Sequence, residues 1–494
     1  MESIESALNR ESESLGQQVR SAVIWRSGSQ IVAQLVQWAA TFLVIRILAP
    51  ADYGLFAMAQ VILVLLNMLN GYGLASGLIQ QKDVTDHQVR QLFGMLILVN
   101  VALAAAQMLL APVAAAYYRQ PIVADMLHVQ ALIYLTTPFI ALSYALLSRT
   151  MDFRRQAKVN IIASMASASA ALGGAMAGLG VWTLVIAPIV LFSFRAVGMT
   201  MAANSLMWPS FDFRGAGHLA RYGGVMAAGQ LFWFFESQAD VFIAGRSFDP
   251  HLLGIYTTSL FLTQIFVAKI VPPLNEVAFS AYARIQHDHD AVAHAFARSI
   301  RIIMVAALPF YLGLAATAEP LVLTMLGDKW REAVPVVRLL AFAMPFMTMQ
   351  VLLAPACDAR GRPGISVRNG ATGAVLLTGA YLFGVHWGVM GLAWSWLAAY
   401  PLYLAISLWR SLPVIGVRPR ALFDAILPPA IAATGMAIIV VAVDDVLPTM
   451  PIAARLGCLV AVGAVIYFGW LATFSRALLG DIAGMVRRRP LAVA

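Results

Sequence analysis

Fourteen long apolar runs divide this chain almost from end to end, and they limit its fold more than any other feature. Each run is at least as long as the roughly 20 residues that a helix needs to cross a bilayer. Open strands would leave backbone groups unpaired in lipid, and barrel strands would alternate polar and apolar residues. The sequence therefore predicts an all-α polytopic membrane protein with about 14 transmembrane helices. The runs cover residues 22–47, 55–79, 91–116, 122–148, 157–178, 181–203, 219–245, 251–275, 299–319, 333–356, 365–385, 388–409, 421–443 and 452–474.

Composition excludes a water-soluble protein of this length. Apolar residues make up 61% of the chain and charged residues 12%, whereas a soluble protein carries about 25% charged residues. The net charge of +9 would suggest a nucleic-acid partner in a soluble protein. Here the cations lie in short connections between apolar runs, so membrane topology and anionic headgroups account for them and no nucleic-acid partner is expected.

The distribution of Lys and Arg predicts the orientation of the helices. With the N-terminus inside, 23 of the 33 basic residues fall in the inside segments, 6 in the outside segments and 4 within spans. Inside loops of membrane proteins carry this excess of positive charge. The bias predicts that both termini are cytoplasmic, and losing one span would invert the pattern downstream of it.

A short motif occurs twice at an offset of 200 residues. The segment Arg46–Phe56 and the segment Arg246–Tyr256 share the spacing Arg-x3-Pro-x3-Gly-aliphatic-aromatic, and Gln30 and Gln230 keep the same offset. Pro and Gly at these positions are typical of the end of one helix and the start of the next. The repeat predicts two parallel six-helix lobes, a known transporter plan. The expected domains are a cytoplasmic segment 1–21, an N-lobe 22–212, a C-lobe 213–410, two further helices in 411–480 and a basic cytoplasmic tail 481–494.

Three segments carry a family resemblance that covers most of the chain. They are the turn Arg46–Phe56, the segment Phe279–Gln286 after Pro272 and Pro273, and the most specific one, Leu326-Gly-Asp-Lys-Trp330-Arg-Glu-Ala-Val-Pro335. With these segments the chain resembles the polysaccharide transporter (Wzx-type) oligosaccharide flippases of the MATE-like superfamily, in the branch that serves exopolysaccharide and colanic-acid-type pathways. We expect Trp330 at the outer interface as an anchor, with stacking on a sugar as the alternative.

The resemblance implies a substrate and a location. The substrate would be an undecaprenyl-diphosphate-linked oligosaccharide, moved from the cytoplasmic to the periplasmic leaflet of the bacterial inner membrane for exopolysaccharide or lipopolysaccharide biosynthesis. It also suggests contact with a polysaccharide polymerase and a chain-length regulator. A monomer is expected, because two lobes already supply a central cavity.

Cations within the predicted spans are the candidates for substrate binding, because ionisable groups are costly in lipid. Arg26, Arg195 and Lys269 fall in the cytoplasmic half of their spans. Guanidinium groups bind phosphate oxygens in a bidentate manner, so we predict that these three bind the substrate diphosphate. The alternative is that each side chain extends to the inner interface. The polar residues of the first run, Gln34 and Gln37 among them, indicate a face turned away from lipid.

Two carboxylates in the seventh span are candidates for ion coupling. Glu236 and Asp240 are one helical turn apart and share a face. A proton or a sodium gradient is the energy source considered, and no other cofactor is expected. The alternative role is an ion pair with Arg46, Arg246 or Arg338.

Other functions are less consistent with the residues. A cation-coupled drug antiporter of the MATE type would need acidic residues for its substrates, and the cytoplasmic half holds more cations than carboxylates. A membrane polymerase or ligase would need a large outer loop with catalytic side chains, and the longest outer connection, 317–333, has about 17 residues. No catalytic residues are predicted, so the protein is interpreted as a transporter and not an enzyme. No metal site is predicted either, since His287, His289 and His294 are read as part of a solvated loop.

Overall fold

The computed structural model describes residues 33–69, 85–150, 152–212 and 217–474, without side-chain detail for 217–231. Within these ranges every regular element is a helix. The polypeptide must satisfy its backbone hydrogen bonds without water when it lies in lipid, and helices do so within each segment. The structure therefore confirms the all-α prediction.

Helices occupy the described part of each of the fourteen predicted runs. The elements are the helix Ala33–Ile47 and α2 (Pro50–Asn67), α4 (Asp86–Tyr118), α5 (Ile122–Gln130), α6 (Leu132–Arg149), α7 (Phe153–Met176), α8 (Val181–Ala203), α9 (Gly217–Ser247), α10 (Pro250–Lys269), α11 (Val271–Arg284), α12 (His289–Ala316), α13 (Ala318–Met325), η1 (Asp328–Trp330), α14 (Ala333–Val351), α15 (Leu353–Ala359), α16 (Pro363–Gly384), η2 (Val385–Trp387), α17 (Gly388–Ile415), α18 (Pro419–Val446) and α19 (Ile452–Phe474).

Eleven helical segments of the described chain are long and apolar enough to cross a membrane. One of them, Pro363–Ile415, spans 53 residues and contains two of the predicted runs, joined by η2. Large apolar side chains are exposed along these helices, as for Leu109 (75%) and Val375 (77%). Outward-facing apolar side chains of this kind are what lipid, and not water, solvates. The chain is a multi-span membrane protein.

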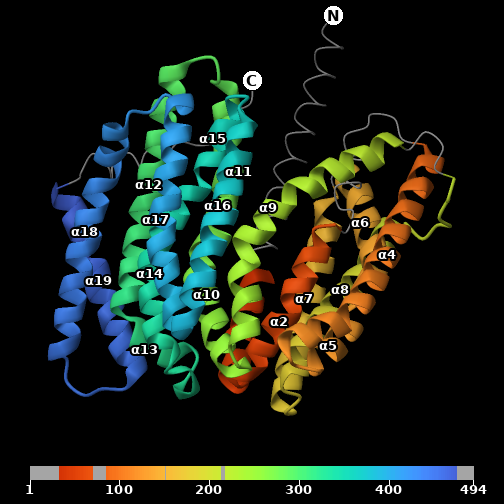
Figure 1. Cartoon of the computed structure of the whole chain (residues 1–494), viewed down its shortest axis with the longest axis horizontal. Helices are drawn as coiled ribbons and strands as arrows, with labels where there is room; N and C mark the ends of the chain where they lie inside the picture. Colours follow the sequence, from red (N-terminus) through yellow and green to blue (C-terminus); the bar gives the residue numbers. More distant parts are fainter. Residues whose placement is uncertain (1–32, 70–84, 151, 213–216, 475–494) are drawn as a thin grey trace, which may run out of the picture. The chain divides into compact units, whose positions relative to one another are not determined.

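The helices form two compact units, divided between Phe234 and Phe235 inside α9. In the first unit, α8 packs against α6 and α7, and α4 packs against α5 and α6. In the second unit, α14 packs against α10, α12 and α17, while α16 packs against α17. Figure 1 shows the long helices of this second unit running side by side.

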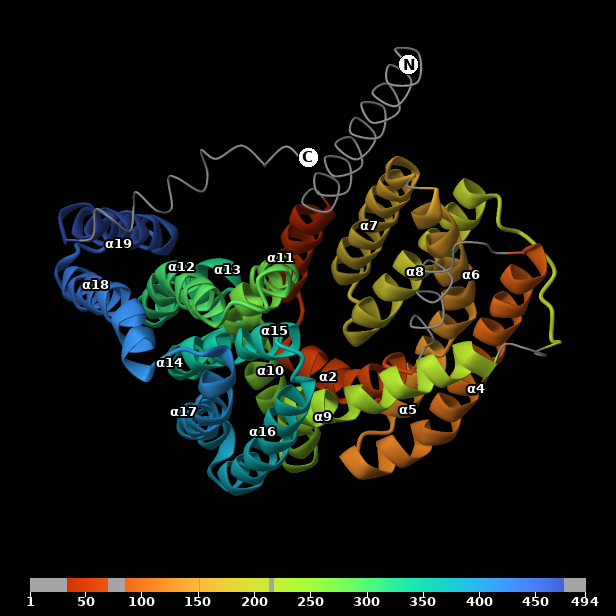
Figure 2. The same ribbon diagram turned by 90° about the horizontal axis from the view of Figure 1, so that it is seen from above.

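The last two helices belong to the second unit. From the sequence, residues 411–480 were predicted to add two helices to the two lobes. In the structure, α18 packs along α12, and α19 packs against α13 and α18. Figure 2 shows α18 and α19 together at the edge of this unit. The predicted lobe boundary at residue 213 falls outside the described residues, and the division of the units lies further along, within α9.

The repeated motif ends one helix and begins the next in both copies, as predicted. Pro50 and Pro250 are the first residues of α2 and α10, where the missing amide proton costs nothing. Asp249 Oδ1 accepts a hydrogen bond from the Leu252 amide at 3.0 Å. In the first copy the Asp52 carboxylate accepts one from the Ala49 amide, also at 3.0 Å.

The prediction for Trp330 was wrong. Its side chain is completely buried in the second unit, in the short helix η1. Leu326 and Ala333 from the same sequence motif are also fully buried. The motif therefore packs the connection between α13 and α14 onto the unit, and Trp330 neither anchors the outer interface nor offers a face to a sugar.

Two glycines allow α16 and α17 to approach each other closely. A Cβ atom at Gly391 would collide with the carbonyl oxygen of Gly384 and would lie 2.8 Å from the Cβ of Trp387. A Cβ atom at Gly384 would lie 2.6 Å from the Gly391 carbonyl oxygen. Because these obstacles include backbone atoms, they cannot rotate away.

Gly391→Ala is expected to lower the free energy of unfolding by about 1–3 kcal/mol, since the added methyl group overpacks this crossing. The measurement is thermal unfolding of the detergent-solubilised protein. Gly379→Ala in the same helix pair is the matched control, because its Cβ would meet nothing within 4 Å and Ala is the better helix former. Equal melting temperatures for the two variants would contradict the close crossing.

Candidate functional site

A polar cavity of about 560 Å³ lies in the first unit, among helices that are otherwise apolar. Four elements line it: the helix Ala33–Ile47, α6, α7 and α8. Its polar lining is Gln34, Gln37, Tyr144, Gln156, Asn160, Ser164 and Arg195. Ligand sites are commonly cavities of about 300–1,000 Å³ with a few placed polar groups.

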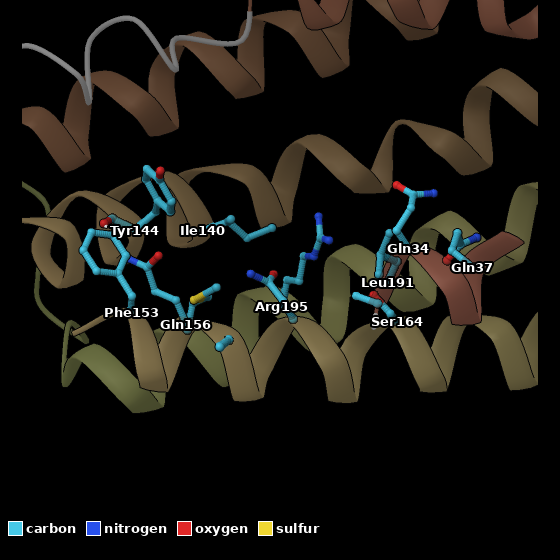
Figure 3. A pocket seen from close by; sticks show the side chains of 13 residues that line it. Gln34, Gln37, Ile140, Tyr144, Phe153, Gln156, Ser164, Leu191 and Arg195 are labelled. Atoms are coloured by element: carbon cyan, nitrogen blue, oxygen red, sulfur yellow. Dashed lines mark hydrogen bonds between the residues drawn. The ribbon is translucent and has the colours of Figure 1, made fainter. Parts of the chain in front are cut away.

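Arg195 supplies the positive charge of this cavity. It lies in α8 about two turns before the helix ends at Ala203. Its side chain is half-buried, and its Nε atom is inaccessible to solvent. Figure 3 shows the guanidinium between the end of the cavity formed by Tyr144 and Gln156 and the end formed by Gln34 and Gln37. Arg195 is the charged member of the described lining.

Side-chain amides line the same cavity as the guanidinium. Gln156 is buried and donates a hydrogen bond to Ser148 Oγ at 3.1 Å and a longer one to the Tyr144 carbonyl at 3.4 Å. These bonds fix its carboxamide at the wall between α6 and α7. An amide both donates and accepts, so the lining can bind hydroxyl groups as well as an anion.

Of the three predicted substrate cations, the two that the structure describes lie in different units. Arg195 lines the cavity, Lys269 is exposed as the last residue of α10 in the second unit, and Arg26 lies outside the described residues. Within the first unit, the described residues thus bring one of the three into a cavity. A joint diphosphate site for all three stays a prediction.

In the sequence, Gln34 and Gln37 indicate only a face turned away from lipid, and Gln156, Asn160 and Ser164 were not predicted to belong to a site. The available signal was amide and hydroxyl side chains inside apolar runs. That signal is weak in a single sequence, because such residues also cap and pack helices.

A second polar cluster is built around Asp240 in the second unit. Asp240 in α9 is 2% exposed. The Tyr256 hydroxyl of α10 donates to Asp240 Oδ2 at 2.8 Å, and the Trp396 Nε1–H of α17 donates to the Tyr256 oxygen at 2.8 Å. The Val241 amide donates to Asp240 Oδ1 at 2.8 Å. Three helices thus hold one buried carboxyl group.

Aromatic rings exclude water from this cluster. Tyr400 stacks on Trp396 with ring centroids 4.8 Å apart, and Tyr381 lies 5.9 Å from the same indole. Both tyrosines are fully buried. Glu236, one turn before Asp240, is half-buried and lies beside the Tyr403 hydroxyl.

The candidate partners of the two carboxylates are placed at the surface of their units. Arg46, Arg246 and Arg338 are all exposed. The hydrogen bonds described for Asp240 come from Tyr256 and from the backbone, and no arginine is among these described partners. A buried carboxyl group with neutral donors can exist ionised or protonated, because burial disfavours the charge and the donors favour it. The coupling role of Glu236 and Asp240 stays a prediction.

Tyr256 and Trp396 were missed from the sequence. Tyr256 occupies the aromatic position of the second repeat, where the first copy has Phe56. At the same offset, Asp240 corresponds to Ala40. Asp240 and Tyr256 thus occur together in the second copy of the repeat, and both are missing from the first copy. This paired difference can be seen in the sequence and could have indicated that the two side chains interact.

Known proteins similar to this chain are connected with cell-surface polysaccharides. A family described as polysaccharide biosynthesis protein matches residues 43–335, which is more than half of the chain. The teichuronic acid biosynthesis protein TuaB of Bacillus subtilis is 24% identical over 463 residues, which cover 92% of this chain and 95% of TuaB. The succinoglycan biosynthesis transport protein ExoT of Rhizobium meliloti is 25% identical over 352 residues, 71% of each chain.

The fold is similar to that of a known flippase. The lipid II flippase MurJ in its inward closed conformation superimposes with a TM-score of 0.74, covering 92% of this chain and all of MurJ, at 11% sequence identity. Identity this low carries the fold alone. Together with the membrane-spanning helices, these findings confirm the family resemblance found in the sequence: the chain is a multi-span membrane protein that belongs to the polysaccharide biosynthesis protein family.

Proposed function

We propose that this protein is a flippase that moves undecaprenyl-diphosphate-linked oligosaccharides from the cytoplasmic to the periplasmic leaflet of the bacterial inner membrane. It would do so by alternating access, with both termini cytoplasmic, for exopolysaccharide or lipopolysaccharide synthesis. The observation that carries the proposal is the cavity around Arg195, in which one cation is surrounded by amide and hydroxyl groups within a membrane-spanning bundle.

The lining matches the two polar parts of such a substrate. A diphosphate concentrates negative charge, and a guanidinium binds phosphate oxygens with two parallel hydrogen bonds. Sugar hydroxyls both donate and accept, as do the carboxamides of Gln34, Gln37 and Gln156. A polar ligand that crosses a membrane needs such groups because each unpaired polar atom in lipid costs several kcal/mol.

The same lining argues against a transporter of cationic drugs. A cation would be repelled by Arg195 and would need a carboxylate in the cavity. The described lining contains none. The carboxyl groups of Glu236 and Asp240 lie in the second unit, where aromatic rings cover Asp240.

A polymerase or ligase is also less consistent with the fold. The longest predicted outer connection, 317–333, folds into α13 and η1 and packs onto the second unit. The described part of this connection is therefore a structural segment and not a catalytic loop. The name of ExoT, a transport protein, supports the transporter interpretation as well.

Asp240 is the proposed coupling residue. Uptake of a proton or a sodium ion by its carboxyl group would change the charge of a group held by α9, α10 and α17 together. A charge change at a point shared by three helices can shift their packing, and this is how an ion gradient would drive the alternation.

Arg195→Gln is expected to slow flipping at least about tenfold, since a hydrogen bond to a charged group contributes roughly 1.5–3 kcal/mol. The measurement uses proteoliposomes with a labelled undecaprenyl-diphosphate oligosaccharide and follows the label as it becomes accessible on the far leaflet. Arg338→Gln, at an exposed position of α14, is the matched control and should leave the rate unchanged.

The outcomes separate the site from the function. If Arg195→Gln flips the substrate at the wild-type rate, the cavity has no part in the mechanism, while the flippase function stands. Absence of flipping by the wild type, together with ion-coupled uptake of small cations, would replace the proposal with a drug antiporter.

Asp240→Asn is expected to abolish stimulation of flipping by an imposed ion gradient, because the amide cannot change its charge. The Tyr256 hydroxyl can still donate to the amide oxygen, so the fold should be retained. Flipping is measured in the same liposomes with and without a proton or sodium gradient. Asp424→Asn, an exposed carboxylate in α18, is the control. Equal stimulation in both variants would exclude Asp240 as the coupling residue.

A further inference from the structure

A second cavity, lined by basic residues, lies in the second unit and has no part in the proposed function above. Its volume is about 430 Å³, and its lining includes His289, Arg360, Arg362, Gly364, Arg368 and Val414. In the sequence these arginines are only part of the inside charge. Arg360 and Arg362 lie in the connection between α15 and α16, and Arg368 lies in the second turn of α16. His289 at the start of α12 and Val414 near the end of α17 complete the lining.

Arg360 is held in place by neighbouring backbone. Its guanidinium donates to the Val414 carbonyl at 3.3 Å and to the carbonyl oxygen of Gln286. It also contacts the imidazole of His289 at 2.7 Å. Because a guanidinium only donates, the ring nitrogen of His289 must accept. These contacts fix the direction of Arg360, and none of these described partners is a carboxylate that would neutralise its positive charge.

Two further arginines line the same cavity, and a third contacts the backbone of one of them. Arg362 and Arg368 are exposed, and Arg410 of α17 donates to the Arg368 carbonyl at 3.2 Å and to Thr372 Oγ1 at 2.6 Å. The described lining contains no carboxylate. The nearby Asp358 accepts a hydrogen bond from Ser366 Oγ at 2.6 Å. Like charges that are held together repel one another, and an anion between them relieves this repulsion.

The position of the cavity indicates which anion it takes. Three membrane-spanning helices end here: α12 begins at His289, α16 begins at Pro363 and α17 ends at Ile415. The ends of spanning helices lie where the phosphates of lipid headgroups lie. Basic pockets between such helices bind anionic headgroups, and the start of α16 adds the positive end of a helix dipole.

We infer that this cavity is a second anion site, which binds the phosphate group of an anionic membrane lipid between Arg360, Arg362 and Arg368. It lies in a different unit from the Arg195 cavity and does not depend on the substrate proposed for that cavity. Bound lipid would join α12, α16 and α17 at one end and so stabilise the second unit.

The test compares two double variants of the full-length protein that lose the same charge. Arg362→Gln/Arg368→Gln removes the two exposed cations of the cavity, and Arg418→Gln/Arg420→Gln removes two exposed cations near the start of α18 that do not line it. Each protein is placed in phosphatidylcholine nanodiscs with increasing cardiolipin, and its thermal unfolding is recorded. Parallel samples without cardiolipin receive inorganic pyrophosphate.

Cardiolipin is expected to raise the melting temperature of the wild type and of the Arg418/Arg420 variant. Its apparent affinity should be at least about tenfold weaker in the Arg362/Arg368 variant, because that variant loses two of the three guanidinium groups that line the cavity and can donate charge-assisted hydrogen bonds to the phosphate. No effect of pyrophosphate would identify a lipid headgroup as the ligand. If pyrophosphate instead raises the melting temperature of the wild type and of the Arg418/Arg420 variant but not of the Arg362/Arg368 variant, that result would support the same anion site and show that it also binds free phosphate. Equal weakening in both variants, or no cardiolipin effect on the wild type, would overturn the inference.

Discussion

Backbone hydrogen bonding in lipid is the constraint on which the rest of this structure depends. Each spanning segment must pair its own amide and carbonyl groups, so the chain forms helices wherever it is apolar. Side chains on these helices are then solvated by lipid or by one another. Polar side chains within the bundle are costly, and they are retained where they have partners or a ligand. Among the described residues, three groups of polar side chains lie around Arg195, around Asp240 and around Arg360.

The two repeats share the same turn between two helices but differ in the chemistry of their side chains. Each has a proline at the start of its second helix, with a buried glycine one turn later. Yet Ala40 and Phe56 of the first repeat correspond to Asp240 and Tyr256 of the second. The first unit instead places its polar groups on α6, α7, α8 and the helix Ala33–Ile47, where they line a cavity. The same repeated helix pair thus occurs in one unit with a polar cavity and in the other with a buried carboxyl group.

Sequence motifs that identify the family need not belong to the site. Leu326, Trp330 and Ala333 are fully buried and pack a connection against the second unit. Gly384 and Gly391 likewise serve a close helix crossing. Conversely, Gln156 and Trp396 lie in the two polar clusters and belong to none of the motifs from which the resemblance was recognised. Such motifs consist of residues that the fold needs for packing. The polar side chains that could bind a ligand lie far apart in the sequence and outside these motifs.

Apolar runs, helix length and the repeated Pro–Gly turn act locally along the chain, so the sequence alone predicted an all-helical membrane protein and the places of its described helices. It also drew attention to Arg195 and Asp240, since a charge in an apolar run is visible without a structure. The surroundings of these two residues emerge only from the folded chain: the carboxamides of two other helices, Ala33–Ile47 and α7, in the Arg195 cavity, the Tyr256 and Trp396 donors at Asp240, and the burial of Trp330. The sequence could not give these because which helix faces meet depends on packing between segments up to about 160 residues apart, as for Gln34 and Arg195, and a single sequence carries no direct record of that packing.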